Sequence, residues 1–372
     1  MKLLEACELI VDCPHSTAKD EGEGYPLIRT PNIGRGRLML DNVHRVSESV
    51  YHKRNERAIP QENDLILARE APVGNVALIR HGQKVCLGQR TVLIRPNSEL
   101  VDPEFLVYYL LSPGIQHVLL NSANGATVSH LNMSDIRKLD ISLPPLNIQR
   151  RIGRTISILD DKISINTEIN QNLSEQAEAL YLKFFSPKSG THGIVVTLDE
   201  YCDIFTGKKN ANASVEGGKY KFFTCAPESL LIDSYIYDGN AIIVSGNGAY
   251  TGRTRFYSGK FDLYQRTYAC TLLDGINPDF IFPLYWFVKL ELSKKIIGGT
   301  RGSAIPYIVM NDLAKFEFIY NEEVFAVNMP IFKSLTEAIQ INEIENEHLS
   351  NLRDTILPKL MSGELDVSEL EI

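Results

Sequence analysis

Apolar side chains recur at alternating steps of four and three residues between Leu146 and Phe185. This heptad spacing is typical of a coiled-coil helix rather than of an ordinary amphipathic helix. Two positions in the middle of the seam hold asparagine instead, Asn166 and Asn170. The apolar seam positions are Ile152, Ile156, Leu159, Ile163, Leu173, Ala177, Leu180 and Phe184. At 1.5 Å per residue, the predicted helix is roughly 60 Å long.

A second heptad run with the same kind of gap lies near the C-terminus, at an offset of 176 from the first. It predicts a helix from about Pro330 to about Met361, with Gly363 as a stop signal. Pro358 is expected to kink the last turn or to end the regular helix early. The seam positions are Phe332, Leu335, Ile339, Leu349, Ile356 and Leu360, with Asn342 and Asn346 in the gap.

The paired asparagines suggest that the two helices are partners. A buried seam asparagine lowers coiled-coil stability but fixes the register, because its amide must find a hydrogen-bonding partner. In an antiparallel pair, Asn166 would face Asn346 and Asn170 would face Asn342. The alternative is that each helix packs on its own globular segment, with the asparagines in solvent.

The segment 1–145 alternates between short apolar runs and turn-forming residues, which predicts a mixture of strands and helices. A helix is expected after Asp102-Pro103, because Asp is a favoured N-cap and Pro a favoured first residue. Strands are expected at Tyr25–Thr30, Asp64–Ala68, Val76–Ile79, Thr91–Ile94 and Leu139–Leu143.

The segment after the first long helix repeats this order of features. Gln265-Arg266-Thr267 repeats Gln89-Arg90-Thr91 at an offset of 176. Further along, Asp238–Val244 takes the place of the strand at 64–68, and Asn277-Pro278 opens a second, aromatic helix. The start of the repeat slips, because Tyr25 corresponds to about Tyr220, an offset near 195. These matches predict a duplicated protein of two modules.

The predicted fold is mixed α/β (α+β), with two globular domains, two long helices in an antiparallel coiled coil and an internal pseudo-twofold duplication. The expected segments are the first globular domain at 1–145, its helix at 146–186, the second domain at 187–327, and the second helix with an acidic tail at 328–372.

Composition is that of an ordinary globular protein, with 44% hydrophobic and 23% charged residues in a chain of 372. The first residues are interrupted by Glu5, Glu8 and Asp12, so they predict neither a signal peptide nor a membrane span. We therefore expect a cytoplasmic protein that makes no membrane contact. The net charge is −8, of which the segment 328–372 carries −6. Each nearly neutral globular segment can therefore still present a basic face.

Motifs of catalysis and metal binding are missing from the chain. Gly207-Lys208-Lys209 lacks the remaining residues of a phosphate-binding loop, and the glycines between Gly246 and Gly252 do not fit GxGxxG. There is no HExxH, no GxSxG and no CxxC pair, and the six cysteines are scattered. We therefore expect no catalytic residue, no metal site and no cofactor on this chain, which favours a binding protein.

Basic residues gather instead in loops of both globular segments. Arginine reads guanine in the major groove, whereas lysine mostly contacts phosphates. A solvated charged face is the plainer interpretation for any single residue, but two sets in equivalent loops favour DNA. The candidates for DNA contact are Arg29, Arg35, Arg37 and Arg69 in the first module and Lys208, Lys209, Lys221, Arg253 and Arg255 in the second.

Several motifs together resemble the specificity subunits of type I restriction–modification systems. The sequence Ile141-Ser-Leu-Pro-Pro-Leu-Asn-Ile-Gln149 leads into the first helix, and Leu357-Pro-Lys-Leu-Met-Ser-Gly-Glu-Leu365 closes the second. Asp64-Leu-Ile-Leu-Ala-Arg69 with Gly74, and Asn240–Val244 with Gly252, are similar to the signature of that family's target recognition domains. The resemblance spans essentially the whole chain.

The resemblance implies two target recognition domains that each read one half of a bipartite DNA sequence, held apart by the coiled coil. It implies no catalysis by this chain. The implied partners are double-stranded DNA, two modification subunits that methylate adenine, and restriction subunits that translocate and cut. S-adenosylmethionine, ATP and magnesium would then be bound by those partner subunits. One departure is that Ile319-Tyr-Asn-Glu322 stands where Leu143-Pro-Pro-Leu146 leads into the first helix, so the two ends are not expected to dock a partner identically.

Two other interpretations remain open. A coiled-coil scaffold whose two domains bind proteins or glycans would keep its function when Arg35, Arg37, Lys208 and Lys209 are neutralised. A fused enzyme with an unrecognised site is the least favoured, because methyltransferase and nuclease motifs are missing.

Overall fold

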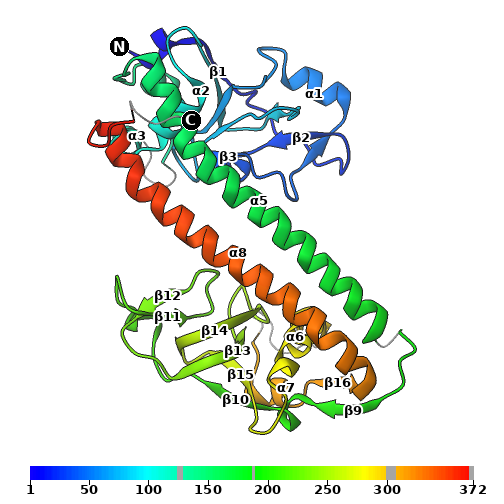
Figure 1. Ribbon diagram of the computed structural model, residues 1–372. Coiled ribbons are helices and arrows are strands. Elements are labelled where there is room, and N and C mark those ends of the chain that lie inside the picture. Colours follow the sequence, from blue (N-terminus) through cyan, green and yellow to red (C-terminus); the bar gives the residue numbers. More distant parts are fainter. Residues whose placement is uncertain (124–128, 187–188, 299–306, 368–372) are drawn as a thin grey trace. The chain divides into compact units, whose positions relative to one another are not determined.

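Both heptad runs form long helices in the computed structural model, which describes residues 1–123, 129–186, 189–298 and 307–367. Helix α5 spans Leu146–Phe184 and helix α8 spans Glu322–Ser362 (Figure 1). The chain divides into two compact units, and each long helix contributes one part to each of them. Unit 1 is Met1–Ser164 together with Asn346–Ile372, and unit 2 is Ile165–Glu345.

Unit 1 contains a five-stranded sheet in the order β1-β8-β5-β6-β3 and a three-stranded sheet in the order β4-β2-β7. Strand β5 is buried along its whole length, as its continuous apolar sequence predicts. Helix α2 packs on β3 and β6. The strands are β1 (Cys7–Asp12), β2 (Tyr25–Ile28), β3 (Gly36–Arg37), β4 (Arg45–Val46), β5 (Leu65–Ala68), β6 (Val76–Leu78), β7 (Cys86–Leu87) and β8 (Thr91–Pro96). The helices are α1 (Glu48–Arg54), α2 (Pro103–Leu111), α3 (Pro113–Ser122) and α4 (Met133–Arg137), with short 3₁₀ turns η1 (Leu3–Ala6) and η2 (Thr30–Asn32).

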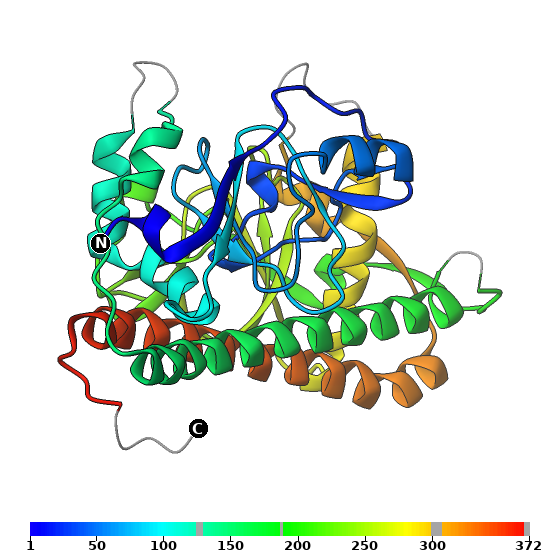
Figure 2. The ribbon, with the colours of Figure 1, turned by 90° about the horizontal axis from the view of Figure 1, so that it is seen from above.

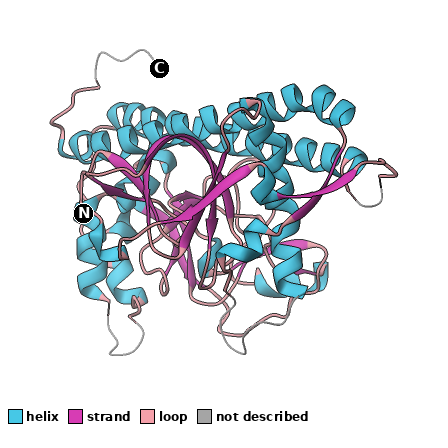
Figure 3. Cartoon of the chain, turned by 90° about the horizontal axis from the view of Figure 1, so that it is seen from below, coloured by secondary structure: helices cyan, strands magenta, loops and turns pink. Residues whose placement is uncertain are grey.

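Unit 2 contains a six-stranded sheet in the order β10-β15-β13-β14-β11-β12 and a two-stranded sheet of β16 and β9. Helix α6 packs on β13 and β14; Figure 3 distinguishes the helices (cyan) from the strands (magenta). The strands are β9 (Ile194–Thr197), β10 (Cys202–Thr206), β11 (Tyr220–Phe223), β12 (Leu230–Ile232), β13 (Tyr237–Ser245), β14 (Thr254–Leu263), β15 (Thr267–Leu272) and β16 (Glu317–Tyr320). The remaining elements are α6 (Ile281–Gly298), α7 (Met310–Ala314), η3 (Leu198–Glu200), η4 (Ala211–Ala213) and η5 (Pro278–Phe280).

Strand pairing shows the duplication directly. In unit 1, β8 lies between β1 and β5 and is antiparallel to both, and in unit 2, β15 lies in the same way between β10 and β13. The parallel pair β2–β7 has its counterpart in the parallel pair β11–β14. The register places Ile28 beside Leu87 in unit 1 and Phe223 beside Leu263 in unit 2. The slip in the sequence repeat is therefore real, because strands near the start of each module match at offsets near 195 and later strands at 176.

Within each unit the two long helices run antiparallel. In unit 2, the amide of Asn342 donates to Oδ1 of Asn170 at 2.7 Å, and the amide of Asn170 donates to the carbonyl of Ile339 at 3.2 Å. In unit 1, Arg353 of α8 donates to Oδ1 of Asp160 on α5 at 2.7 Å. Figures 1 and 2 both show the first turns of α5 beside the last turns of α8, drawn in red. The helices also pack on globular parts, so both interpretations of the heptad runs hold in part.

Helix α8 begins at Glu322, earlier than the predicted start at Pro330. The side chain of Asn321 accepts from the backbone N–H of Val324 at 3.0 Å, which satisfies one of the free donors at the helix start. Of the two effects expected of Pro358, an early end of the helix is wrong, because α8 continues to Ser362, whereas a kink in the last turn stays a prediction. Both prolines lie on the exposed side of the helix, where water can hydrogen-bond the carbonyls that lose their partners. Gly363 follows with a φ of +77°, as its role as a stop signal predicts.

A strand at Leu139–Leu143 was expected, but the structure has an isolated bridge between Lys2 and Asp140 there. The backbone N–H of Leu3 donates to the carbonyl of Leu139, and that of Ile141 donates to the carbonyl of Met1. The apolar alternation of this segment is therefore used to bury Leu139 and Ile141, with too little pairing for a regular strand.

Candidate nucleic-acid interface

Four loops meet at one end of the five-stranded sheet in unit 1, and we call residues 13–18, 29–32, 69–74 and 88–91 loop edge 1. The first three follow β1, β2 and β5, and the fourth precedes β8. The antiparallel pairing of β8 with β1 and β5 brings these ends together. A backbone hydrogen bond of 2.9 Å from the N–H of Arg69 to the carbonyl of Arg90 joins two of the loops.

The corresponding loops of unit 2 meet in the same way, and we call residues 207–209, 224–228, 246–253 and 264–267 loop edge 2. The backbone N–H of Gln265 donates to the carbonyl of Lys209 at 3.0 Å, and that of Gly246 donates to the carbonyl of Arg266 at 2.8 Å. The thiol of Cys225 also points at the Arg266 carbonyl, at 3.2 Å. Each unit therefore presents one cluster of loops built on the same strands.

Four of the nine predicted DNA-contacting residues are bonded within their own unit. Arg69 donates to both carboxylate oxygens of Asp12, at 3.0 and 2.9 Å, and to the carbonyl of Leu131 at 2.7 Å. Arg37 forms an ion pair with Asp161 on α5. Lys209 donates to the buried carboxylate of Asp262 at 2.6 Å. These cations hold loops and helices in place.

The fourth is Arg255, whose guanidinium donates to the carbonyl of Pro227 at 2.6 Å. It also lies over the ring of Phe223, 5.8 Å from the centroid. Burial lowers the pKa of Arg255 below its ordinary value, and the nearby charge of Arg253 lowers it further. This side chain therefore supports the loop after β11.

The other five predicted residues are less tightly held. Arg35, Lys208 and Arg253 are exposed. Arg35 has a long hydrogen bond of 3.3 Å to the carbonyl of Leu111, and Arg253 lies over the ring of Tyr250 at 5.7 Å. Lys221 is half-buried on β11, and Arg29 is half-buried on loop edge 1. Of these five, Arg29 lies on loop edge 1, and Lys208 and Arg253 lie on loop edge 2. These three residues therefore lie at the corresponding end of the sheet in each unit.

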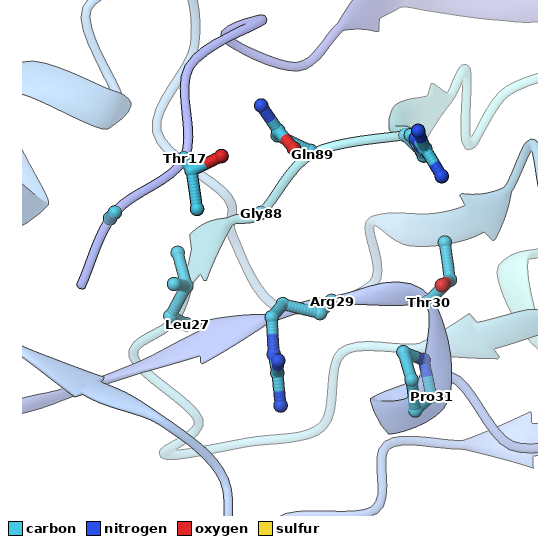
Figure 4. Close-up of a pocket in the computed structure, with 9 residues that line it drawn as sticks. Thr17, Leu27, Arg29, Thr30, Pro31, Gly88 and Gln89 are labelled. Carbon is cyan, nitrogen blue, oxygen red and sulfur yellow. The ribbon is translucent and has the colours of Figure 1, made fainter. Parts of the chain in front are cut away.

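A cavity of about 280 Å³ opens at loop edge 1 and is lined by Thr17, Arg29, Thr30, Gly88, Gln89 and Arg90, among others. Figure 4 shows the side chains of Arg29 and Gln89 on opposite sides of Gly88. A side chain at Gly88 would place its Cβ 2.6 Å from the carbonyl oxygen of Ile28 and 2.9 Å from Cγ of Arg29. The glycine thus keeps a polar, cation-rich hollow open. The Nε of Arg29 is buried and has no hydrogen-bond partner among the described residues.

Each unit anchors one helix of its globular part to a long helix through a buried donor. In unit 1, the hydroxyl of Tyr108 on α2 donates to Oδ2 of Asp160 on α5 at 2.7 Å. In unit 2, the indole N–H of Trp286 on α6 donates to Oγ1 of Thr336 on α8 at 2.9 Å. Asp160 and Thr336 are related by the same offset of 176 as the heptad runs. Sequence reasoning missed both anchors, although this shared offset was a usable signal.

The predicted register asparagines lie at seam positions, as expected, but their hydrogen-bond partners differ in kind. Asn170 pairs with Asn342, as described above. The amide of Asn166, which is fully buried, donates to Oε2 of Glu345 at 2.7 Å. Asn346 is half-buried on the part of α8 that belongs to unit 1. The role of these four side chains in fixing register stays a prediction.

Potential metal ligands do not cluster in the described part of the chain. It contains no group of three or more His, Cys, Asp or Glu side chains that could hold a metal ion. Burial raises the pKa of the thiols of Cys86 to about 11 and of Cys7 and Cys202 to about 12, so these groups are weak nucleophiles near neutral pH. A membrane-spanning helix was not found either, since each described helix is too short or too polar.

The chain contains two copies of one α/β module. Each copy is joined to a long helix and has a cluster of polar loops at one end of its sheet. This arrangement defines a duplicated recognition protein. Comparison with known families gives a more specific result. The chain belongs to the family described as type I restriction modification DNA specificity domain, whose sequence profile matches residues 7–175 and again 194–352. The two matches correspond to the two modules and extend into the long helices.

Individual relatives are specificity subunits of type I restriction enzymes. The EcoDI subunit of Escherichia coli is 33% identical over 179 residues, which are 46% of this chain and 38% of that subunit. The match therefore spans well under half of that relative. The MjaIX subunit of Methanocaldococcus jannaschii is 22% identical over 371 residues, covering 87% of this chain and 85% of that subunit.

A solved structure gives independent support for the fold. The type I restriction–modification S subunit from M. genitalium superposes with a TM-score of 0.66 at 16% identity, covering 97% of this chain and 95% of that one. At this identity the likeness supports the fold of two repeated modules with long helices.

Proposed function

We propose that this chain is the DNA specificity subunit of a type I restriction–modification complex. Each module recognises one half of a bipartite target, and the chain directs adenine-N6 methyltransferase and restriction endonuclease subunits to that target. The observation that carries the proposal is the equivalent loop edge of the two units in a chain that belongs to the DNA specificity family. Two similar binding surfaces in one chain suit a target with two half-sites.

We propose that the predicted DNA-contacting residues have two different roles. Arg29, Lys208 and Arg253 on the loop edges, with Arg35 and Lys221, are the proposed contacts to DNA. Arg37, Arg69, Lys209 and Arg255 are proposed to support the loops instead, because their charges are already bonded within the protein. A test of DNA binding should therefore neutralise residues of the first set.

The long helices are proposed to set the spacing between the half-sites and to dock the modification subunits. Docking is supported by apolar side chains that are exposed on the part of the helix pair in unit 2. Ile165 and Ile169 of α5 are 51% and 42% exposed, and Ile341 and Ile344 of α8 are 65% and 54% exposed. Exposed apolar side chains that lie close together mark interaction surfaces.

Catalysis is proposed to belong to the partner subunits. Two modification subunits would bind S-adenosylmethionine, and restriction subunits would bind ATP and magnesium. The chain itself is proposed to have no enzymatic activity and to act in the cytoplasm, where chromosomal DNA lies in a prokaryote.

The proposal is tested by equilibrium DNA binding of the chain assembled with its modification subunits. We expect sequence-specific binding by the complex, and weaker binding when Arg35, Lys208 and Arg253 are replaced by glutamine. A scaffold that binds proteins or glycans would show no specific DNA binding and no effect of these changes. Arg37 and Lys209 are unsuitable for this test, because neutralising them would break internal ion pairs.

A further inference from the structure

A tight turn occurs at the corresponding place on both loop edges, with the same two residues at its tip. In unit 1 the turn is Gly88-Gln89-Arg90-Thr91, and in unit 2 it is Tyr264-Gln265-Arg266-Thr267. Each turn leads into the central strand that pairs with two others, β8 or β15. The threonine is fully buried in both, at 0% exposure, whereas both arginines are exposed.

Each turn is closed by a hydrogen bond, from a side-chain hydroxyl in unit 1 and from a backbone N–H in unit 2. The hydroxyl of Thr91 donates to the carbonyl of Gly88 at 3.0 Å, and the backbone N–H of Thr267 donates to the carbonyl of Tyr264 at 2.9 Å. The first residue of each turn also donates to the end of the parallel strand, Gly88 to Ile28 at 2.7 Å and Tyr264 to Phe223 at 2.9 Å.

The loop after β1 or β10 holds the glutamine at each tip. The side-chain amide of Gln89 donates to the carbonyl of His15 at 3.3 Å, and the backbone N–H of Gln265 donates to the carbonyl of Lys209 at 3.0 Å. His15 and Lys209 are related by an offset of 194, as are the paired strand residues Ile10 and Ile204. The two tips therefore occupy the same place in the two modules and share their residues, although the φ of Arg90 is positive and that of Arg266 is not.

The arginines of the two tips are positioned to meet a ligand. Arg90 adopts a φ of +63°, which is uncommon for a side chain larger than glycine. Its guanidinium is 59% exposed and pairs with Glu70 at 2.7 Å, which orients it across loop edge 1. Arg266 is exposed and has no carboxylate partner among the described residues.

The surroundings of the two tips differ although the tips are the same. Arg29 and Thr30 follow β2 in unit 1, and Thr224 and Cys225 follow β11 in unit 2. Gly88 leaves a hollow beside the first tip, where unit 2 has Tyr264. Residues that differ between the modules can distinguish two half-sites. Residues that are the same in type and in their place in the fold cannot do so, and they suit what the half-sites share.

We propose that the Gln89-Arg90 and Gln265-Arg266 tips bind the phosphate backbone of DNA and fix the orientation of each module on its half-site. The inference rests on the proposed function. Arginine and the glutamine amide both donate hydrogen bonds to phosphate oxygens, and such contacts set register without reading sequence. Base discrimination then comes from the neighbouring loops that differ.

The test uses the full chain assembled with its modification subunits and the variants R90Q, R266Q and both together. Binding is measured on two duplexes of the same length over a range of salt concentrations. One duplex contains the target sequence, identified as the sequence that is methylated in the host, and the other has a random sequence. Each single change should weaken binding to both duplexes by the same factor, about threefold, and lower the salt dependence of log K by about 0.9. The methylated sequence in the host should stay the same.

Arg154→Gln is the matched control, because Arg154 is exposed on α5 and belongs to neither loop edge. It should keep the wild-type salt dependence, and thermal unfolding should show that all variants are folded. The inference is overturned if the tip variants bind as the wild type does, if they lose discrimination at one half-site, or if the control has the same effect. If the wild-type complex does not prefer its target over random DNA, the proposed function fails as well.

Discussion

Asp102 is the N-cap of helix α2. Its side chain stabilises the start of the helix, but burial of its ionised carboxylate lowers the stability of the folded chain. Its side chain accepts from the backbone N–H of Phe105 at 2.9 Å, as the Asp-Pro pattern predicted. Burial raises the pKa of Asp102 above its ordinary value, so the folded protein holds the proton more tightly than the unfolded chain does. Its contribution to stability is therefore largest below the ordinary pKa and is lost as the pH rises through the folded pKa.

Replacing Asp102 by asparagine should keep the cap and remove the buried charge. We expect D102N to be more stable than the wild type at pH 7 and to lose the fall in stability above about pH 4, near the ordinary carboxyl pKa. D102A should lose about 1 kcal/mol, because the N–H of Phe105 is left without its acceptor. Urea unfolding at pH 4 and pH 7 measures both effects, and a less stable D102N at pH 7 would show that the charge is favourable.

Cys225 offers a native probe of loop edge 2. Its thiol is half-buried and touches the carbonyl of Arg266, whereas Cys13, Cys86, Cys202 and Cys270 are buried. We expect a maleimide reagent to label Cys225 in the folded chain faster than these four. Target DNA bound to the complex should slow this labelling, because it covers the loop edge. Equal labelling with and without bound DNA would place the interface elsewhere, and C225S is the control for the assignment of the label.

Residue roles were only partly predictable from the sequence. The caps Asp102 and Gly363 could be recognised because they act through local backbone geometry. Arg69, Arg37 and Lys209 looked like DNA contacts, yet each pairs with a carboxylate that is distant in the sequence. A single sequence does not show which distant charge will lie beside an arginine. The cations that form ion pairs within the protein could therefore not be recognised before the structure was known.

Asp160 connects three helices of unit 1. Its carboxylate accepts from Tyr108 on α2 and from Arg353 on α8, each at 2.7 Å, and it is 5% exposed on α5. Removing it leaves the buried hydroxyl of Tyr108 without this acceptor, and it leaves the mostly buried guanidinium of Arg353 with Asp354 as its remaining carboxylate partner, at 2.9 Å. Such losses are costly, because the remaining groups stay desolvated.

We therefore expect D160A to lower the free energy of unfolding by about 3 kcal/mol. The neighbouring Asp161 is a matched control, because it pairs with Arg37 but is 39% exposed. D161A should cost about 1 kcal/mol or less. Chemical denaturation of the two variants measures the difference, and similar losses would contradict the anchoring role of Asp160.

The asparagine pair of unit 2 gives a second prediction at this scale. Because Asn342 donates to Asn170, N170L alone leaves an unsatisfied amide and should destabilise the chain by about 1 kcal/mol. The double variant N170L/N342L should be more stable than the wild type, since both amides are replaced by apolar groups. Under the proposed function, it should also accept targets with altered half-site spacing, which sequencing of methylated DNA detects. Raised stability with unchanged spacing would exclude a role in register while leaving the pairing intact.

Elements were foreseen where the pattern is local or repeated. Heptad spacing predicted both long helices, and short apolar runs bounded by turn residues predicted β2, β5, β6, β8 and β13. The start of α8 was missed because Pro330 resembles a first helical residue, although its exposed position lets the helix pass through it. The strand at Leu139–Leu143 was overpredicted because its partner is the short segment at residues 1–3, which pattern alone does not identify.

For the whole molecule, duplication is the property that links the sequence to the proposed function. Repeated strand pairings, repeated helix anchors and a shared turn show two versions of one module, and the family match covers both. The duplication and the family could be recognised from the sequence, because offsets of 176 and about 195 survive in it. The converging loops could not, since they depend on strand order within each sheet.

Under the proposed function, this chain selects a bipartite DNA target for methylation by its partners. Sequencing of methylated adenine in the host, with the intact gene and with the gene deleted, tests it most directly. We expect one bipartite methyladenine motif to disappear on deletion and to return on complementation, with replacement of loop edge 2 changing one half of the motif alone. An unchanged methylation pattern after deletion of the gene would contradict the proposed function.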